Sequence, residues 1–174
     1  MISLKGKKVA MIIASQNFRD EELFEPKKVL EDYGASVSLA SSSLSPARGV
    51  RGGTAKPNLL LEQVKVANFD AVVFVGGAGA SEYFNNPQAH LIAKETANVG
   101  KVLAAICIAP STLANAGVLK GKKVTAFASE EGNLKAKGAI WTGSAVEADG
   151  NIITANGPGS AKAFGEAIAK ALSH

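Results

Sequence analysis

The chain has 174 residues, of which 47% are hydrophobic and 20% are charged, with a net charge of +4. This length fits one domain, residues 1–174, and the composition excludes a disordered chain. The basic pI, near 9.2, is compatible with nucleic-acid binding, but the lysines form short clusters and only 6% of residues are aromatic, so we predict a solvated basic surface and no nucleic-acid partner.

The single cysteine excludes an internal disulfide bond, so the fold does not depend on oxidation. No apolar run approaches the roughly 18 residues that a membrane span needs. Paired cysteine ligands and histidine clusters are also missing from the sequence, which argues against a structural metal site. We therefore expect a cytoplasmic protein with no membrane partner and no metal.

Short apolar runs alternate with longer segments of helical periodicity. The run Val9–Ala14 is almost uniformly apolar, which is typical of a parallel strand covered on both faces. Residues 20–33 have helical periodicity with Pro26 inside them, and residues 35–41 alternate as a strand does. Residues 46–59 are rich in glycine and proline and predict a short hairpin.

The second half of the chain continues this alternation. Its predicted strands are 70–75, 101–107 and 122–127, and its predicted helices are 87–99, 110–116 and one that begins at Pro158. The dipeptide Asp149-Gly150 lies between two alternating runs and predicts a second hairpin. Strands that alternate with crossover helices indicate an α/β fold around a mostly parallel, doubly wound sheet.

Cys107 lies between a predicted strand and a predicted helix, at the edge where sites gather in open parallel sheets. Amide groups at the start of that helix would favour a thiolate and lower the thiol pKa. A buried cysteine that serves only as a small core residue fits the same spacing. The spacing alone does not decide between the two interpretations.

Glu22 is a candidate partner because Pro26, four residues later, cannot donate to the Glu22 carbonyl. We expect the helix to break or kink there, which would aim the carboxylate over the strand ends. Glu21 and Glu25 are close in sequence, however, and a solvated glutamate is the commoner outcome on spacing alone.

Gly76 and Gly77 follow another predicted strand and can offer backbone amides to an oxyanion, or serve only as turn residues. The segment GGAGAS lacks the third glycine of a dinucleotide fingerprint, and the turn after the first strand has no glycine. We therefore expect no cofactor.

Four motifs in the right order resemble the ThiJ/PfpI superfamily. The run LAAICIAPSTLANAGVLKGKKVT is similar to its cysteine elbow, and DEELFEP to its glutamate turn. FDAVVFVGGAGA is similar to its glycine turn, and DGNIITANGPGSAKAFGEAIAKAL to its terminal hairpin and helix. The resemblance covers almost the whole chain.

The resemblance implies a flavodoxin-like three-layer sandwich that is usually dimeric, so we expect a homodimer. It also implies that Cys107 is the nucleophile and that Glu22 is the carboxylic acid touching its sulfur. Backbone amides matching Gly76, Gly77 and Ile108 would line the pocket. The expected pocket wall is Phe127, Asn156, Gly157 and Pro158.

The chain departs from the family pattern at positions that matter for hydrolysis. Ile108 follows the cysteine, where members named as proteases usually carry histidine, and Phe127 stands where one branch has a pocket histidine. Ala155 and Asn156 replace a serine-arginine pair before Gly157. The two histidines of the chain, His90 and His174, lie away from the expected pocket.

Three functions are compatible with these residues. The first is a glyoxalase III-like or deglycase-like enzyme that uses Cys107 and Glu22 on small 2-oxo aldehydes, turning methylglyoxal into lactate in stress protection. The second is a redox-sensing or protective protein that acts through oxidation of Cys107. The third, an intracellular cysteine peptidase, would need a histidine from an oligomer contact.

Overall fold

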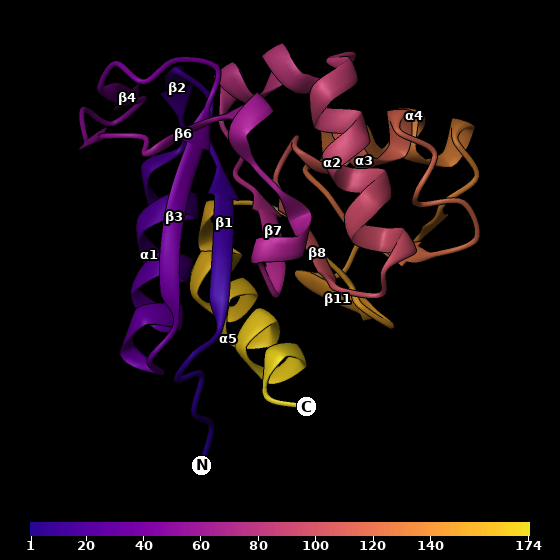
Figure 1. Cartoon of the computed structure of the whole chain (residues 1–174). Coiled ribbons are helices and arrows are strands. Elements are labelled where there is room, and N and C mark those ends of the chain that lie inside the picture. Colours follow the sequence, from indigo (N-terminus) through magenta and orange to yellow (C-terminus); the bar gives the residue numbers. More distant parts are fainter.

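The computed structural model describes residues 1–174, and a seven-stranded sheet lies at its centre (Figure 1). Every pair of neighbouring strands is parallel except β11 and β12, which form the hairpin predicted at Asp149-Gly150. In spatial order the strands are β11 (Val146–Asp149), β12 (Ile152–Ala155), β8 (Val102–Ile106), β7 (Ala71–Phe74), β1 (Lys8–Ile12), β3 (Ser36–Ser41) and β6 (Leu59–Leu60).

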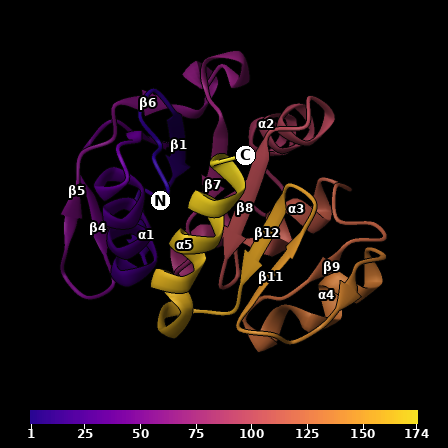
Figure 2. The ribbon, with the colours of Figure 1, turned by 90° about the horizontal axis from the view of Figure 1, so that it is seen from below.

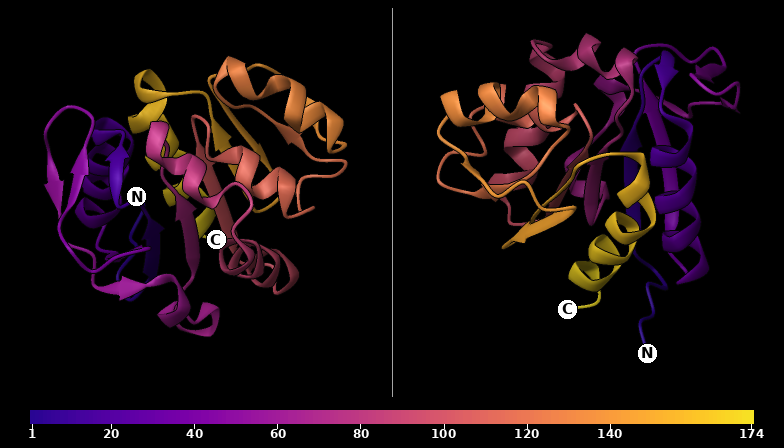
Figure 3. Two further views of the ribbon diagram at one scale, coloured as in Figure 1. Left: turned by 90° about the horizontal axis from the view of Figure 1, so that it is seen from above. Right: turned by 180° about the vertical axis from the view of Figure 1, so that it is seen from behind.

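Helices cover both faces of this sheet, as the views from below, above and behind show (Figures 2 and 3). The α-helices are α1 (Asp20–Asp32), α2 (Pro87–Asn98), α3 (Pro110–Asn115), α4 (Glu131–Ala136) and α5 (Ala161–Leu172). Short 3-10 helices lie at 61–63, 66–68, 78–83, 128–130 and 158–160.

The alternation of β1 explains the two core layers. Val9 and Met11 point to the layer that α1 and α5 cover, and Ala10 and Ile12 point to the layer under α2 and α3. Successive side chains of a strand face opposite sides, so a uniformly apolar strand needs cover on both. The predicted flavodoxin-like three-layer sandwich is confirmed.

Helix α1 runs unbroken from Asp20 to Asp32, so the expected break at Pro26 does not occur. Pro26 lies instead at the closest contact between α1 and α5. A Cβ added to Gly165 of α5 would come within 2.8 Å of the Pro26 Cα, so only glycine permits this approach of the two helices.

The glycine-rich segment forms the predicted hairpin, from β4 (Ala47–Gly49) and β5 (Thr54–Ala55), and β4 pairs with β2 (Gln16–Phe18). Asp20, in the first turn of α1, holds this hairpin. Its two carboxylate oxygens accept the amide N–H groups of Arg51, at 2.8 Å, and Gly53, at 2.7 Å.

Two predictions in the region after Cys107 were wrong or incomplete. Only Lys123–Val124 (β9) of the predicted strand 122–127 is extended, and it pairs with β10 (Ile140–Trp141) outside the central sheet. Helix α4 was not predicted, since it buries only Leu134 and so has little apolar periodicity. None of the helices is both long and apolar enough to span a membrane.

Candidate active site

Cys107 is the first residue after β8, at the carboxyl edge of the sheet. Its φ is 65°, a left-handed conformation that is costly for a residue with a side chain. Two backbone hydrogen bonds hold it there: its N–H donates to Ala155 at 3.0 Å, and its carbonyl accepts the Phe127 N–H at 2.8 Å. Neighbouring structure thus enforces the sharp elbow that the sequence predicts.

Glu22 lies behind this elbow, on the first turns of α1, and is completely buried. Neither carboxyl oxygen has a well-formed hydrogen bond in the present side-chain orientation. The thiol of Cys107 is nevertheless close enough for a hydrogen bond with Glu22 to contribute to the pKa of both groups. The carboxyl group therefore points at the cysteine and not into solvent.

Gly76 makes the approach of these two side chains possible. A Cβ built on Gly76 would collide with Oε1 of Glu22, and it would lie 2.5 Å from the Cβ of Cys107 and 2.7 Å from the Ile106 carbonyl oxygen. Atoms this close leave no room for any side chain. The first glycine after β7 thus provides space between the two groups.

The backbone amides of Gly77 and Ile108 favour the charged form of the Cys107 sulfur and lower its pKa. Gly77 has a φ of 107°, and a Cβ there would lie 2.6 Å from the Asn17 carbonyl oxygen. Glycine is needed at this turn both for its conformation and for its close contact with the preceding loop.

The two reactive groups have strongly raised pKa values. Burial raises the pKa of the Cys107 thiol to about 12; the negative charge of Glu22 adds to the increase, and the two amides oppose it. Burial also raises the pKa of Glu22, to about 7. The expected lowering of the thiol pKa is therefore wrong in direction, because burial outweighs the amides.

These values mean that Glu22 releases its proton before Cys107 does. At neutral pH the site holds a thiol beside a carboxyl group that is close to half ionised. The part of the thiol pKa increase that comes from the Glu22 charge disappears when Glu22 is protonated. Protonation of Glu22 therefore lowers the cost of removing the thiol proton, while burial of the sulfur, the larger cause of its raised pKa, remains.

A cavity of about 490 Å³ opens over Cys107. Phe127 and Pro158 line it as predicted, whereas Asn156 and Gly157 do not. The side-chain Oδ1 of Asn156 instead accepts the hydroxyl of Ser160 at 2.7 Å. The lining residues are Arg19, Val50, Gly77, Ala78, Cys107, Ile108, Phe127, Ser129 and Pro158.

Four of the lining side chains were not predicted, and one of them, Ala78, directly follows the predicted Gly77. Arg19 directly precedes the helix that carries Glu22, and Ser129 follows Phe127 by two residues, so both are near residues that the sequence did single out. Val50 comes from the β4–β5 hairpin, and nothing in the sequence indicates that this hairpin reaches the cysteine.

Neither histidine reaches the cavity. His90 lies on α2, where its Nε2 atom is 2.8 Å from the Phe84 carbonyl oxygen, and His174 is the last residue of the chain. No group of three or more histidine, cysteine or carboxylate side chains is arranged to hold a metal ion.

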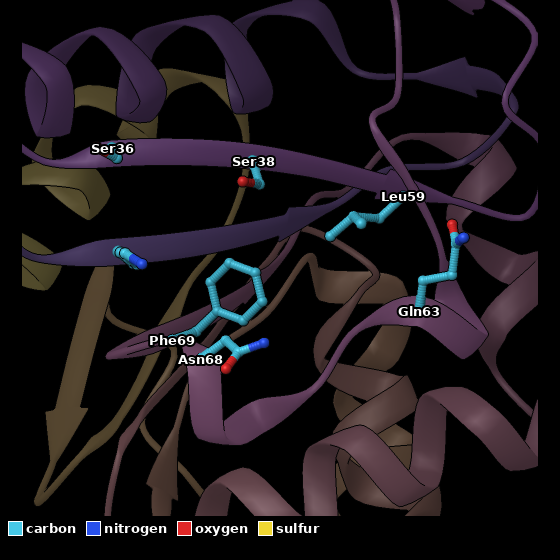
Figure 4. Close-up of a pocket in the computed structure, with 7 residues that line it drawn as sticks. Ser36, Ser38, Leu59, Gln63, Asn68 and Phe69 are labelled. Carbon is cyan, nitrogen blue, oxygen red and sulfur yellow. The ribbon is translucent and has the colours of Figure 1, made fainter.

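A second concavity of about 490 Å³ lies beside the amino-terminal ends of β1 and β3, at the opposite edge of the sheet from Cys107 (Figure 4). The aromatic ring of Phe69 and the side chain of Leu59 face Ser38 across it. It is lined by Lys8, Ser36, Ser38, Leu59, Gln63, Asn68 and Phe69. This lining contains no thiol and no carboxyl group, so the reactive thiol belongs to the other cavity, the one over Cys107.

Comparison with known proteins extends the resemblance noted in the sequence. The model of the DJ-1/PfpI family matches residues 7–171. A crystal structure of a ThiJ/PfpI domain protein from Brachyspira murdochii superposes with a TM-score of 0.94 and is 34% identical, with 97% of each chain covered.

Three curated relatives match nearly the whole chain. An uncharacterized protein of Methanocaldococcus jannaschii is 41% identical over 98% of this chain and 84% of its own length. A Thermococcus kodakarensis protein named as a deglycase is 33% identical over 93% of this chain and 98% of its own. A Caenorhabditis elegans protein named as a glutathione-independent glyoxalase is 26% identical over 95% of this chain and 89% of its own.

Proposed function

This chain belongs to the DJ-1/PfpI family, and we propose that it is a cofactor-independent enzyme that uses Cys107 and Glu22 to convert small 2-oxo aldehydes into hydroxy acids. Relatives named as a deglycase and as a glyoxalase support enzymatic activity on carbonyl compounds. The cavity over Cys107 has room for such a molecule.

One observation carries the proposal: Glu22 is fully buried, without a well-formed hydrogen bond, beside the thiol of Cys107. Burying an unsatisfied carboxyl group costs several kcal/mol, so stability alone does not account for it. A pKa of about 7 is well suited to a general base at neutral pH.

The reaction follows from this pair of groups. Glu22 takes the thiol proton as the sulfur of Cys107 adds to the aldehyde carbon, which gives a hemithioacetal after the aldehyde oxygen gains a proton. Glu22 then moves the hydrogen of that carbon, as a proton, to the neighbouring keto carbon. The keto oxygen takes the proton that the hemithioacetal hydroxyl gives up, so the keto carbon now carries a hydroxyl and the sulfur-bearing carbon a carbonyl. The resulting thioester reacts with water, which releases the hydroxy acid and restores the thiol.

Early products of glycation offer the same kind of electrophile. In a hemiaminal or aminocarbinol formed from a 2-oxo aldehyde, the carbon that carries the nitrogen passes to the sulfur of Cys107 and the amine leaves. The later steps are those of the free aldehyde. A deglycase activity would therefore depend on the same two residues.

The test is lactate formation from methylglyoxal. We expect turnover by the wild-type protein, and a loss of at least about 100-fold in kcat/KM in Cys107→Ser and in Glu22→Gln. Glu25→Gln is the matched control, because Glu25 is an exposed carboxylate of the same helix and does not line the cavity. Full activity in Cys107→Ser would refute the proposal.

The redox and peptidase hypotheses have less support. The thiol is 7% exposed and its pKa is raised, which slows oxidation by peroxide, and neither histidine lines the cavity for peptide hydrolysis. Mass spectrometry after treatment with dilute peroxide tests the redox hypothesis. Rapid conversion of Cys107 to a sulfinic acid would favour redox sensing over catalysis.

We also propose a homodimer. Phe24, Leu44 and Val50 are apolar side chains between 39% and 43% exposed, on α1 and around the β4–β5 hairpin. Exposed apolar side chains of this kind could pair with the same surface of a second copy across a two-fold axis. Light scattering of the purified protein tests this, and a monomer at micromolar concentration would contradict it.

A further inference from the structure

Arg19 is the only charged side chain that lines the cavity over Cys107. The other lining residues are glycine, apolar side chains, the thiol itself and one serine. A charge on the wall of an otherwise apolar pocket discriminates among ligands, because its hydration must be replaced by the ligand's own polar group.

The backbone fixes Arg19 beside the reactive pair. Its N–H donates to the Gly76 carbonyl oxygen at 2.9 Å, and the absence of a side chain on Gly77 allows this approach. The charges of Glu22 and Cys107 both contribute to a raised pKa of Arg19, after the larger contribution of its hydrogen bond with Glu21. The guanidinium group is thus within electrostatic range of the sulfur.

Part of the Arg19 guanidinium group is committed and part is free. Nε donates to both carboxylate oxygens of Glu21 at 3.2 Å, and Nη2 donates to one of them at 2.9 Å. Nη1 has no hydrogen-bond partner within the protein. The contact with Glu21 therefore orients the guanidinium group and leaves both N–H donors of Nη1 and one of Nη2 for a ligand.

The positive and negative charges around Arg19 nearly balance, so recognition of an anion depends on the free N–H donors of Arg19 itself. Glu21 is shared with Arg51, whose Nε lies 3.9 Å from Oε1, so two guanidinium groups face one carboxylate. The Asp20 carboxylate is occupied by the amides of Arg51 and Gly53. Glu22 is the remaining acidic group nearby, and it carries only a partial charge at neutral pH.

We infer that this cavity selects carbonyl substrates that carry a carboxylate, with Arg19 as the residue that binds the carboxylate while Cys107 attacks the carbonyl carbon. This substrate class rests on the proposed function of the same site. The free guanidinium edge of Arg19 offers the parallel N–H donors that a single carboxylate accepts.

An alkylation assay tests the role of Arg19 without any turnover. Iodoacetate and iodoacetamide both form an S–C bond with Cys107 and release iodide, but only iodoacetate carries a carboxylate. The ratio of their rates cancels any change in thiol ionisation. We expect Arg19→Gln to lower the iodoacetate-to-iodoacetamide ratio about tenfold, and Arg19→Lys to restore part of it.

Arg48→Gln is the matched control, because it removes the same charge from an exposed residue of β4 outside the cavity wall. Its ratio should stay near that of the wild type. An unchanged ratio in Arg19→Gln would overturn the inference, because Arg19 would then not affect the anionic reagent. An equal decrease in Arg48→Gln would also overturn it, because any positive charge on this surface would then have the same effect.

Turnover provides the second measurement. We expect kcat/KM for 4,5-dioxopentanoate to exceed that for 2-oxopentanal, its neutral analogue, by about tenfold in the wild type and by little in Arg19→Gln. Equal use of both substrates by the wild type would refute the substrate class and leave the proposed function intact. Inactivity on every 2-oxo aldehyde would refute the proposed function, and the alkylation ratio would still decide the role of Arg19.

Discussion

The carboxyl group of Glu22 and the side chain of Cys107 meet across the Cα of Gly76, with no space between them for a side chain at that glycine. They come from helix α1 and from the elbow after β8, which are 85 residues apart in the sequence. A proton transfer between sulfur and carboxyl oxygen depends on this contact, so a small displacement of either group should be costly.

Gly76→Ala should therefore reduce activity strongly. The added Cβ would collide with Glu22 Oε1 and crowd Cys107, and we expect kcat/KM for methylglyoxal to fall about 100-fold or more. Gly159→Ala is the control, because a Cβ at Gly159 meets nothing within 4 Å. Comparable activity in the two variants would mean that the contact is not needed.

The pH dependence of the rate should report the ionisation of Glu22. The carboxylate is the form that accepts the thiol proton, so kcat/KM should rise with pH and level off above the Glu22 pKa of about 7. Initial rates between pH 5 and pH 9 measure this. A profile that keeps the same midpoint in Glu22→Gln would assign the ionisation to another group.

Stability should depend on pH in the opposite sense. Burial raises the pKa of Glu22 from 4.5 to about 7, so the folded state holds this proton more tightly than the unfolded chain does. The resulting stability is greatest below pH 4.5 and is lost as the pH rises through 7. Between pH 5 and pH 8 the loss amounts to about 2 to 3 kcal/mol.

Urea denaturation at these two pH values measures the loss. Glu22→Gln removes the titration, so its free energy of unfolding should exceed that of the wild type at pH 8 and approach it at pH 5. Glu21→Gln should behave differently, because its hydrogen bond with Arg19 lowers the Glu21 pKa. Parallel curves for the wild type and Glu22→Gln would contradict the prediction.

Apolar periodicity predicted the central strands and the long helices because each of them buries a continuous face. The prediction failed where burial is slight, in α4 with its single buried Leu134 and in β9, which lies outside the central sheet. The residue range of helix α1 was predicted, but its continuity through Pro26 was not.

The candidate site was only partly accessible to sequence reasoning. Strand ends pointed to Cys107 and the glycine turn. Pro26 made Glu22 a candidate through a helix break that does not occur, and the resemblance gave Glu22 its role beside the sulfur. The pKa order was not predictable, because it depends on how deeply the thiol is buried once the chain has folded. Arg19 and Val50 were missed for a similar reason, since their positions follow from how the loop before α1 and the β4–β5 hairpin fold over the cysteine.

Backbone strain at Cys107 should be measurable as stability. Its φ of 65° favours glycine, so Cys107→Gly should be more stable than Cys107→Ala by about 1 kcal/mol, although both lack the thiol. At a regular strand position alanine is more stable than glycine, so Ala105→Gly in β8 should be less stable than the wild type. Thermal or urea unfolding measures the difference between the two variants. If Cys107→Ala were more stable than Cys107→Gly, the backbone at the elbow would be unstrained.

Glu130 should position the cavity wall without touching the substrate. Its Oε1 accepts the hydroxyl of the buried Ser111 at 2.7 Å, and its Oε2 accepts that of Ser129 at 2.6 Å. Ser111 belongs to α3, which begins just after Cys107, so Glu130 connects the segment bearing Phe127 and Ser129 to the cysteine elbow. We expect Glu130→Ala to raise KM about threefold to tenfold with little change in kcat.

Two further variants separate this role from a general loss of stability. Glu130→Gln keeps an oxygen acceptor for one of the hydroxyl groups and should recover most of the wild-type KM. Glu131→Ala removes the adjacent glutamate, whose partner is the exposed Lys135, and should leave KM unchanged. If Glu130→Ala lowered kcat and left KM unaltered, the residue would have to act on the reacting groups, because a displaced wall weakens binding before it affects the chemistry at Cys107.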